Sequence, residues 1–157
     1  MNTRYATPKD IPELVRIINL AYRVEDFFID GDRTNTADVK SRMETPGACF
    51  IVVDSDNSDQ LAGAVFVDIH ENRGHFAVLS VDPAFQGRGL ARTLIDAVEK
   101  HCRDAGCTAL DIEVVNLRLE LPAFYTRFGF TPNGTAIFPD TDKLTRDAHL
   151  MLMSKPL

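Results

Sequence analysis

A doubled glycine between a β-rich run and a helical run is the stretch of this sequence best suited to binding a ligand. The segment reads Gln86-Gly87-Arg88-Gly89-Leu90-Ala91. Two glycines one residue apart let a ligand approach the main chain closely, and the free N–H groups of a first helical turn carry the positive end of the helix dipole. Arg88 and Arg92 lie one turn apart and add positive charge. The segment therefore predicts an anion site, with a plain tight connection as the alternative use of the two glycines.

The known anion loops of nucleotide enzymes do not match this segment. A phosphate loop ends in Gly-Lys followed by Ser or Thr, which is absent from the chain, and a dinucleotide fingerprint needs a third glycine where Arg92 stands. The chain also lacks a Gly-x-Ser-x-Gly nucleophile turn. Cys49, Cys102 and Cys107 fit neither a nucleophile signature nor a four-ligand metal site. We therefore expect no metal and no hydrolase chemistry.

The elements that position this segment follow from hydrophobic periodicity. The first half of the chain predicts a strand over 2–6, a helix from Pro8 or Asp10 to about 22, a loop over 24–36, a short helix over 37–43, and β-rich runs over 49–54, 61–69 and 75–81. The connections between these three runs have hairpin lengths, so we expect the runs to pair antiparallel.

After Val81 the period of the pattern changes from that of a strand to that of a helix. A helix is expected from 90 to about 105, then a strand over 109–115, a helix over 119–128, and strands beginning near 130 and covering 148–153. The strand, helix and strand between 75 and 115 imply a parallel crossover in an otherwise antiparallel sheet. The sequence therefore predicts an α/β to α+β fold with a mixed sheet, in a single domain over residues 1–157.

Composition excludes several classes of protein. The 157 residues are 45% hydrophobic and 25% charged, and 17 Lys and Arg against 23 Asp and Glu give a net charge of −6. These values exclude a disordered chain, and the acidic balance argues against a nucleic-acid partner. The odd number of cysteines, three, favours a reduced, cytoplasmic setting. No apolar run approaches the length that spans a bilayer, so we expect no membrane partner.

Two motifs, in the right order, resemble the GNAT superfamily, the acyl-coenzyme A dependent N-acyltransferases. Val81-Asp82-Pro83, followed by the glycine segment 86–91, is similar to the family pattern Gln/Arg-x-x-Gly-x-Gly/Ala after a strand. Downstream, Asn116 and the helix segment Phe124-Tyr125-Thr126-Arg127-Phe128-Gly129-Phe130 look like the family's later element. The order of elements fits over nearly the whole chain. The resemblance implies a mixed, largely antiparallel sheet of six to seven strands with a central parallel crossover, flanked by about four helices.

The resemblance also implies a role for each matching residue. Main-chain groups of Leu79 and Val81 would bind the pantetheine arm and the thioester carbonyl of acetyl-coenzyme A, and Asn116 would bind the pantetheine amide. The pyrophosphate would be held by the main-chain N–H groups of Gln86, Gly87, Arg88, Gly89, Leu90 and Ala91. For Asn116, a residue that closes a turn after a strand is the alternative.

Tyr125 is the catalytic residue that the resemblance implies. When an amine attacks a thioester, the leaving thiolate must be protonated, and a phenol within hydrogen-bond reach of the sulfur is a suitable general acid. Asn116 and Tyr125 are nine positions apart, about two more than in many members of the family. An aromatic side chain packed in the core beside Phe124 and Phe128 is the alternative interpretation of Tyr125.

No motif identifies the group that takes the proton from the amine. The candidates are Glu25, Asp26, Asp111, Glu113 and His149, and proton loss through water is an equal possibility. We expect the acceptor site to include Glu25, Asp26, Phe28 and His149. We also expect the acids Glu25, Asp26, Asp30 and Asp32 to lie on the acceptor side and to favour a cationic amine.

The sequence leads to one principal hypothesis and two rivals. The first is an N-acetyltransferase that moves an acetyl group from acetyl-coenzyme A to a primary amine by direct attack in a ternary complex. The second is a non-catalytic coenzyme A binding module of the same fold, and the third is a generic α/β nucleotide binder. The acceptor, a small molecule or a peptide, is left open, and a monomer and a homodimer are both compatible with the sequence.

Overall fold

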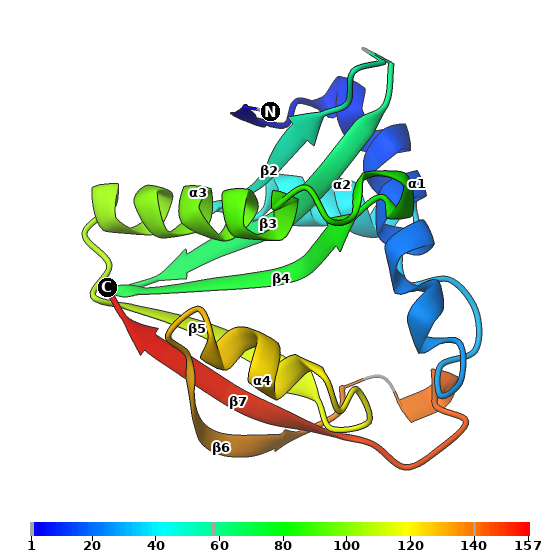
Figure 1. Cartoon of the computed structure of the whole chain (residues 1–157), viewed down its shortest axis with the longest axis vertical. Helices are drawn as coiled ribbons and strands as arrows, with labels where there is room; N and C mark the ends of the chain where they lie inside the picture. The colour runs from blue at the N-terminus through cyan, green and yellow to red at the C-terminus, as the bar shows by residue number, and fades with distance from the viewer. Residues whose placement is uncertain (1, 58, 140) are drawn as a thin grey trace.

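The computed structural model describes residues 2–57, 59–139 and 141–157, and it confirms the predicted fold class: a mixed, mostly antiparallel sheet flanked by helices (Figure 1). The sheet has seven strands in the order β1-β2-β3-β4-β5-β7-β6. The strands are β1 Thr3–Tyr5, β2 Ala48–Asp54, β3 Leu61–His70, β4 Arg73–Val81, β5 Ala109–Val115, β6 Thr131–Ile137 and β7 His149–Pro156. The α-helices are α1 Ile11–Ala21, α2 Thr36–Glu44, α3 Leu90–Asp104 and α4 Leu121–Thr126. Short 3-10 helices cover η1 Pro8–Asp10, η2 Tyr22–Glu25, η3 Pro83–Phe85 and η4 Thr141–Lys143.

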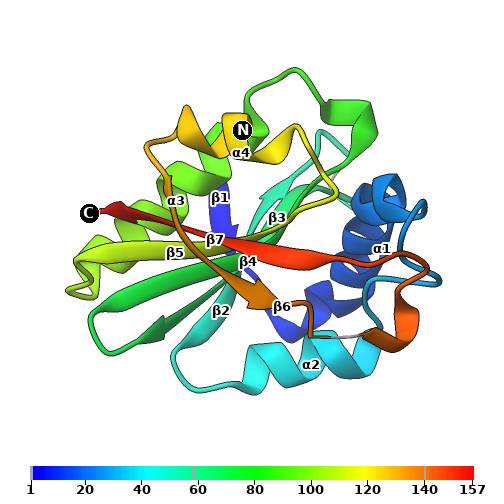
Figure 2. The same ribbon diagram turned by 90° about the horizontal axis from the view of Figure 1, so that it is seen from below.

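The helices cover both faces of the sheet, as the view from below shows (Figure 2). Helix α3 and the residues of α4 pack on one face through a cluster that includes Leu94, Val98 and Phe130. Helices α1 and α2 pack on the other face around Leu14, Ile17 and other apolar residues. The apolar positions of α1 and α3 recur at helical spacing, so each helix buries one stripe against the sheet.

The predicted parallel crossover lies between β4 and β5, and these two strands separate after a short contact. They pair through three residue pairs, of which His75 with Asp111 is the last. Beyond that pair the strands diverge, and the sheet opens into a fork (Figure 1). We call this opening between β4 and β5 the fork. Each arm of the fork stays in a sheet, because β4 pairs with β3 and β5 pairs with β7.

A β-bulge in β4 accompanies the opening of the fork. Phe66 pairs with Ala77 and Ala64 with Ser80, so two residues of β4, Val78 and Leu79, oppose one residue of β3. Val78 has a φ of 49°, a conformation that costs energy for a β-branched residue. A bulge bends its strand and increases the local twist. The bulge therefore turns the second half of β4 away from β5.

Several elements differ by a few residues from their predicted bounds, among them β4, β7 and α4, and the loop predicted over 24–36 contains a 3-10 helix. Helix α4 begins at Leu121 and ends at Thr126, inside the expected range of 119–128. Pro122 sits in the first turn, where its missing N–H costs nothing, and Gly129 then turns the chain with a φ of 94°. The expected loop over 24–36 begins as the 3-10 helix η2 and is tied to the connection between β6 and β7 by Asp30 N–H, which donates to the Lys143 carbonyl at 2.8 Å.

Candidate active site

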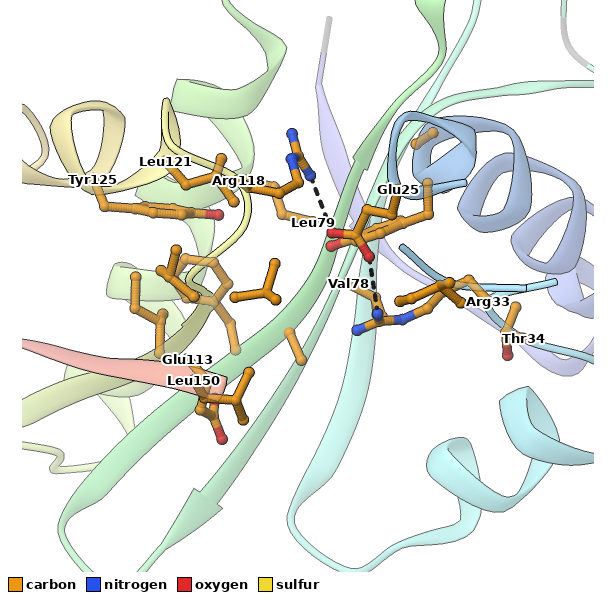
Figure 3. Close-up of a pocket in the computed structure, with 18 of the residues that line it drawn as sticks. Glu25, Arg33, Thr34, Val78, Leu79, Glu113, Arg118, Leu121, Tyr125 and Leu150 are labelled. Carbon is orange, nitrogen blue, oxygen red and sulfur yellow. Dashed lines mark hydrogen bonds and ion pairs between the residues drawn. The ribbon is translucent and has the colours of Figure 1, made fainter. Parts of the chain in front are cut away.

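The fork contains a cavity of about 810 Å³ that joins the glycine segment to η2 and the loop after it. Its walls come from both arms of the fork, from α4, from the loop 26–35 and from the connection between β6 and β7. Figure 3 shows side chains from both arms of the fork, from α4, and from η2 and the loop after it converging on this cavity. Of the residues predicted from the sequence, those on the wall are Leu79, Val81, Gln86, Ala91, Tyr125 and Glu25, together with Asp32 and Glu113. A volume of this size suits a small-molecule ligand.

The glycine segment leads into α3 in the form that an anion site requires. Gly87 and Gly89 have φ values of 80° and 74°, and a Cβ added to either would meet nothing within 4 Å. The first main-chain hydrogen bond of α3 is donated by Thr93 N–H to the Gly89 carbonyl at 3.0 Å. The amides before it belong to the unpaired first turn of the helix, where the dipole is positive. The open main chain therefore fits a diphosphate-sized anion.

Arg88 and Arg92, the two arginines at the glycine segment, each lie over an aromatic ring. The guanidinium of Arg88 lies 5.0 Å from the ring centroid of Phe85, and that of Arg92 lies 4.7 Å from the ring centroid of Phe128. Leu90, in contrast, turns its side chain into the core and is 4% exposed. Positive charge is thus concentrated at the start of α3 in a chain that is acidic overall.

The bulge takes two residues of β4 out of the strand pairing next to the cavity. Val78 and Leu79 have no partner residue in the β3 register, and pairing with β5 has already ended at His75. The Val78 carbonyl accepts from the Ser80 hydroxyl at 2.8 Å, so Leu79 is the one of the two whose main chain can turn to a ligand. Leu79 is drawn on the β4 side of the cavity in Figure 3. A ligand arm that enters from the glycine segment can therefore be bound as a substitute strand.

Tyr125 packs against the core through its ring and also lines the cavity. Its two interpretations, a general acid and a core aromatic side chain, are therefore compatible. Its ring packs at 5.0 Å from Phe124 and 5.9 Å from Phe130, measured between ring centroids. Its hydroxyl points into the cavity (Figure 3). Burial raises the pKa of Tyr125 above its usual range, and the nearby Arg118 charge opposes that rise. The phenol is therefore protonated at neutral pH, as a proton donor must be.

Glu25 is a buried carboxylate at the far end of the cavity. It is 4% exposed, and it forms ion pairs with Arg33 at 3.2 Å and with Arg118 at 3.3 Å (Figure 3). Burial raises the pKa of Glu25, and the two arginines offset part of that rise. The Arg33 guanidinium also stacks on Tyr22, 4.7 Å from the ring centroid. A buried carboxylate with a raised pKa is the expected form of a general base.

Four other carboxylates of the predicted set, Glu113, Asp111, Asp26 and Asp32, are engaged in other contacts. Glu113 accepts from His75 Nε2 at 2.5 Å, and Asp111 pairs with Arg73 at 2.6 Å. Asp26 and Asp32 are exposed, and both pair with Arg23. With Arg33, Arg118 and Arg42 also on the cavity wall, the acids there are matched by arginines.

Three predicted site residues support the strands and the core around the cavity: Asn116, His149 and Phe28. The Asn116 side-chain carbonyl accepts from the His149 main-chain N–H at 2.8 Å, which closes the end of the β5–β7 pair. His149 is exposed, and Phe28 is fully buried in a cluster with Val115 and Phe138. None of Asn116, His149 and Phe28 is on the cavity wall formed by the described residues.

Arg118 and Arg33 are the site residues that sequence reasoning missed. Both pair with Glu25, from segments far apart in the chain. The long spacing between Asn116 and Tyr125 was the available signal, because it adds residues between the end of β5 and α4. Arg118, two positions after Asn116, is one of these residues and lies on the cavity wall.

Within the described residues, no group of three or more His, Cys, Asp or Glu side chains is arranged to hold a metal ion. Across the same residues, no helix has both the length and the apolar character needed to cross a bilayer.

Fold and site together define a mixed-sheet protein with a forked cleft and an open, glycine-flanked helix start at one end. The chain belongs to the acetyltransferase (GNAT) family, whose model matches residues 12–130. Among curated relatives, human N-acetyltransferase 8B is 32% identical over 111 residues, which are 68% of this chain and 49% of the relative. A mycothiol acetyltransferase from Nocardia farcinica is 29% identical over 136 residues, 82% of this chain and 44% of the relative. The chain thus spans less than half the length of each of these two proteins.

Solved structures show the same fold at low sequence identity. The ribosomal-protein-alanine N-acetyltransferase from Brucella melitensis has a TM-score of 0.79 and 21% identity, with 100% of both chains covered. A Bacillus anthracis protein solved in complex with acetyl coenzyme A has a TM-score of 0.64 and 16% identity, covering 76% of this chain and 68% of that chain. At these identities the likeness establishes the fold alone.

Proposed function

We propose that this protein transfers an acetyl group from acetyl-coenzyme A to a primary amine by direct attack in a ternary complex. The observation that carries the proposal is the single cavity that runs from the open glycine segment, past the hydroxyl of Tyr125, to the buried carboxylate of Glu25. Family membership supports acetyl-coenzyme A as the acyl donor. The unpaired amides at the start of α3 fit its pyrophosphate, and the unpaired main chain of Leu79 fits its pantetheine arm.

In the proposed reaction, the neutral amine attacks the thioester carbonyl, a C–N bond forms and the C–S bond breaks. Glu25 takes the proton that the amine nitrogen loses, directly or through water, and Tyr125 gives its phenolic proton to the leaving sulfur. Solvent then returns a proton to the phenolate and removes one from Glu25. Holding both substrates in one cleft supplies most of the acceleration, because it replaces a bimolecular encounter with a fixed geometry.

Replacing Tyr125 with Phe tests the assigned acid. The Tyr125→Phe variant should lose about 100-fold in kcat, the usual size of a general acid contribution, with little change in KM for acetyl-coenzyme A. Tyr5→Phe is the matched control, because Tyr5 is 57% exposed and donates to or accepts from His101 outside the cavity. Full turnover by Tyr125→Phe would remove Tyr125 as the acid.

The rival function is a coenzyme A binding module without turnover. Calorimetry with acetyl-coenzyme A and thiol release over a panel of primary amines separate the two functions. Binding accompanied by release supports the transferase, whereas tight binding with no release from any amine supports the module. Tighter binding of ATP or a dinucleotide than of coenzyme A would overturn both.

A further inference from the structure

Arg118 occupies the position between the two groups that we assign to proton transfer. It stands in the turn between β5 and α4, and its side chain lies between Tyr125 and Glu25 in the cavity (Figure 3). Its Nη1 donates to Glu25 Oε2 at 3.3 Å. Glu25 also receives Arg33 Nη1 on its other oxygen, at 3.2 Å. Each carboxylate oxygen of Glu25 is therefore held by a different arginine, from a different segment of the chain.

One buried donor of Arg118 makes no hydrogen bond. Among the described residues, its Nε is the one buried side-chain nitrogen or oxygen without a hydrogen bond. Glu120 Oε1 lies 3.4 Å from this Nε in an ion pair that lacks hydrogen-bond geometry, and Glu120 is exposed. A buried donor without a hydrogen bond carries a desolvation cost. A donor kept at that cost beside a cavity indicates that a ligand uses it.

We infer that Arg118 holds Glu25 across the cavity from Tyr125 and directs its positive charge, and the Nε–H that makes no hydrogen bond, to the sulfur of the acyl donor. The inference rests on the proposed function, because the sulfur is the atom that Tyr125 protonates. Negative charge develops on that sulfur as the C–S bond breaks. A fixed cation in a site screened from water stabilises such charge more than solvent does.

The charged and titratable groups around Arg118 come from three segments. Tyr22 and Glu25 belong to η2, Arg33 to the loop after it, and Glu120 and Tyr125 to α4 and its start. The Arg118 charge lowers the pKa of Tyr125 against the dominant effect of burial. Both arginines act on Glu25. Arg33 stacks on Tyr22 and lies on the side of Glu25 away from Tyr125 (Figure 3), so it is a matched control that shares the carboxylate.

The first measurement is the binding of free coenzyme A, whose thiol ionises in alkaline solution, so that the thiolate fraction is larger at pH 9 than at pH 7. For the unmodified protein, calorimetry should show several-fold tighter binding at pH 9 than at pH 7, relative to desulfo-coenzyme A, which lacks the sulfur. Arg118→Gln should abolish this preference, and Arg118→Lys should keep part of it. Arg33→Gln should leave it unchanged.

The second measurement is the acidic limb of kcat/KM against pH. Arg118→Gln and Arg33→Gln each remove one positive charge from Glu25, so both should move that limb to higher pH, by about one unit. An unchanged thiolate preference in Arg118→Gln, or an equal loss in Arg33→Gln, would overturn the inference.

If Arg118→Gln does not fold, the same calorimetry is carried out on Glu25→Gln. Removing the carboxylate frees Arg118 of its partner, so the thiolate preference must increase, and no increase would overturn the inference. A protein that binds coenzyme A with no difference between variants contradicts the role of Arg118 alone. A protein that neither binds coenzyme A nor releases thiol contradicts the proposed function itself.

Discussion

The glycine segment depends on a main-chain conformation that other residues reach only with strain. Gly87 has a φ of 80°, and the space where a Cβ would stand is open. An alanine there would not clash with the protein, so its structural cost is the backbone strain of about 1 kcal/mol. Its methyl group would instead fill space next to the free amides of α3. The two consequences can be separated, because the chain offers a second glycine with the same conformation at the opposite end of α3.

Gly87→Ala and Gly106→Ala form a matched pair for this purpose. Gly106 has a φ of 89°, and nothing lies within 4 Å of its Cβ position. Both variants should lose about 1 kcal/mol in the free energy of unfolding measured with urea. Only Gly87→Ala should raise KM for acetyl-coenzyme A, by about tenfold if one main-chain contact worth 1.4 kcal/mol is lost. Equal KM values in the two variants would place the pyrophosphate elsewhere.

At the scale of the elements, a histidine between two carboxylates joins three strands where the fork begins. His75 of β4 contacts Asp68 of β3 through Nδ1 at 2.7 Å and Glu113 of β5 through Nε2 at 2.5 Å. His75 also belongs to the last residue pair of the parallel contact between β4 and β5. Burial alone would lower the pKa of His75, but the two carboxylates outweigh it and raise the pKa to about 9. The protonated imidazole of His75 therefore links β3, β4 and β5 at the point where the fork begins.

This contact gives the stability a defined dependence on pH. A histidine whose pKa is raised on folding stabilises the folded state fully below its unfolded pKa of about 6.5, and it loses that contribution as pH rises through about 9. The free energy of unfolding should therefore fall by about 2 to 3 kcal/mol between pH 6 and pH 10. His75→Gln should remove most of this fall in urea titrations. His70→Gln is the control, because His70 is far more exposed and contacts only Asp68. If the free energy of unfolding of His75→Gln falls as much as that of the unmodified protein, the pH dependence comes from other groups.

Elements whose signal is local could be predicted from the sequence, and those set by distant contacts could not. The change of period after Val81 and the glycine segment predicted both α3 and the parallel crossover. The bulge at Val78 escaped prediction, because a positive φ at a valine contradicts its local preference and is maintained by pairing with β3. The pairing of Glu25 with Arg118 spans 93 positions, and no spacing rule reaches that far. The glycine segment and Tyr125 were therefore accessible from sequence, and the environment of Glu25 was not.

At the scale of the whole molecule, the proposed function requires an acidic protein to bind a strongly anionic substrate. The net charge of −6 opposes this at long range, whereas Arg88 and Arg92 stand at the positive end of α3, beside the glycine segment. Salt screens exposed charges beyond about 10 Å at 0.1 M. The two arginines at the start of α3 should therefore affect binding more than the net charge of the whole protein does. Around Glu25, in contrast, arginines pair with Glu25 and Asp32, so the negative charge of these acids is largely balanced there.

Two double variants of equal net charge decide between local and total charge. Arg88→Gln with Arg92→Gln, and Lys100→Gln with Arg103→Gln at the other end of α3, each change −6 to −6 − 2 = −8. If local charge governs binding, the first pair should raise KM for acetyl-coenzyme A by about tenfold and flatten its dependence on salt, because two cations near the phosphates are lost. The second pair should change KM less than twofold, since Lys100 and Arg103 already pair with Asp104 and Glu99. Equal effects of the two pairs would mean that the field of the whole molecule, rather than the start of α3, sets the affinity for the acyl donor.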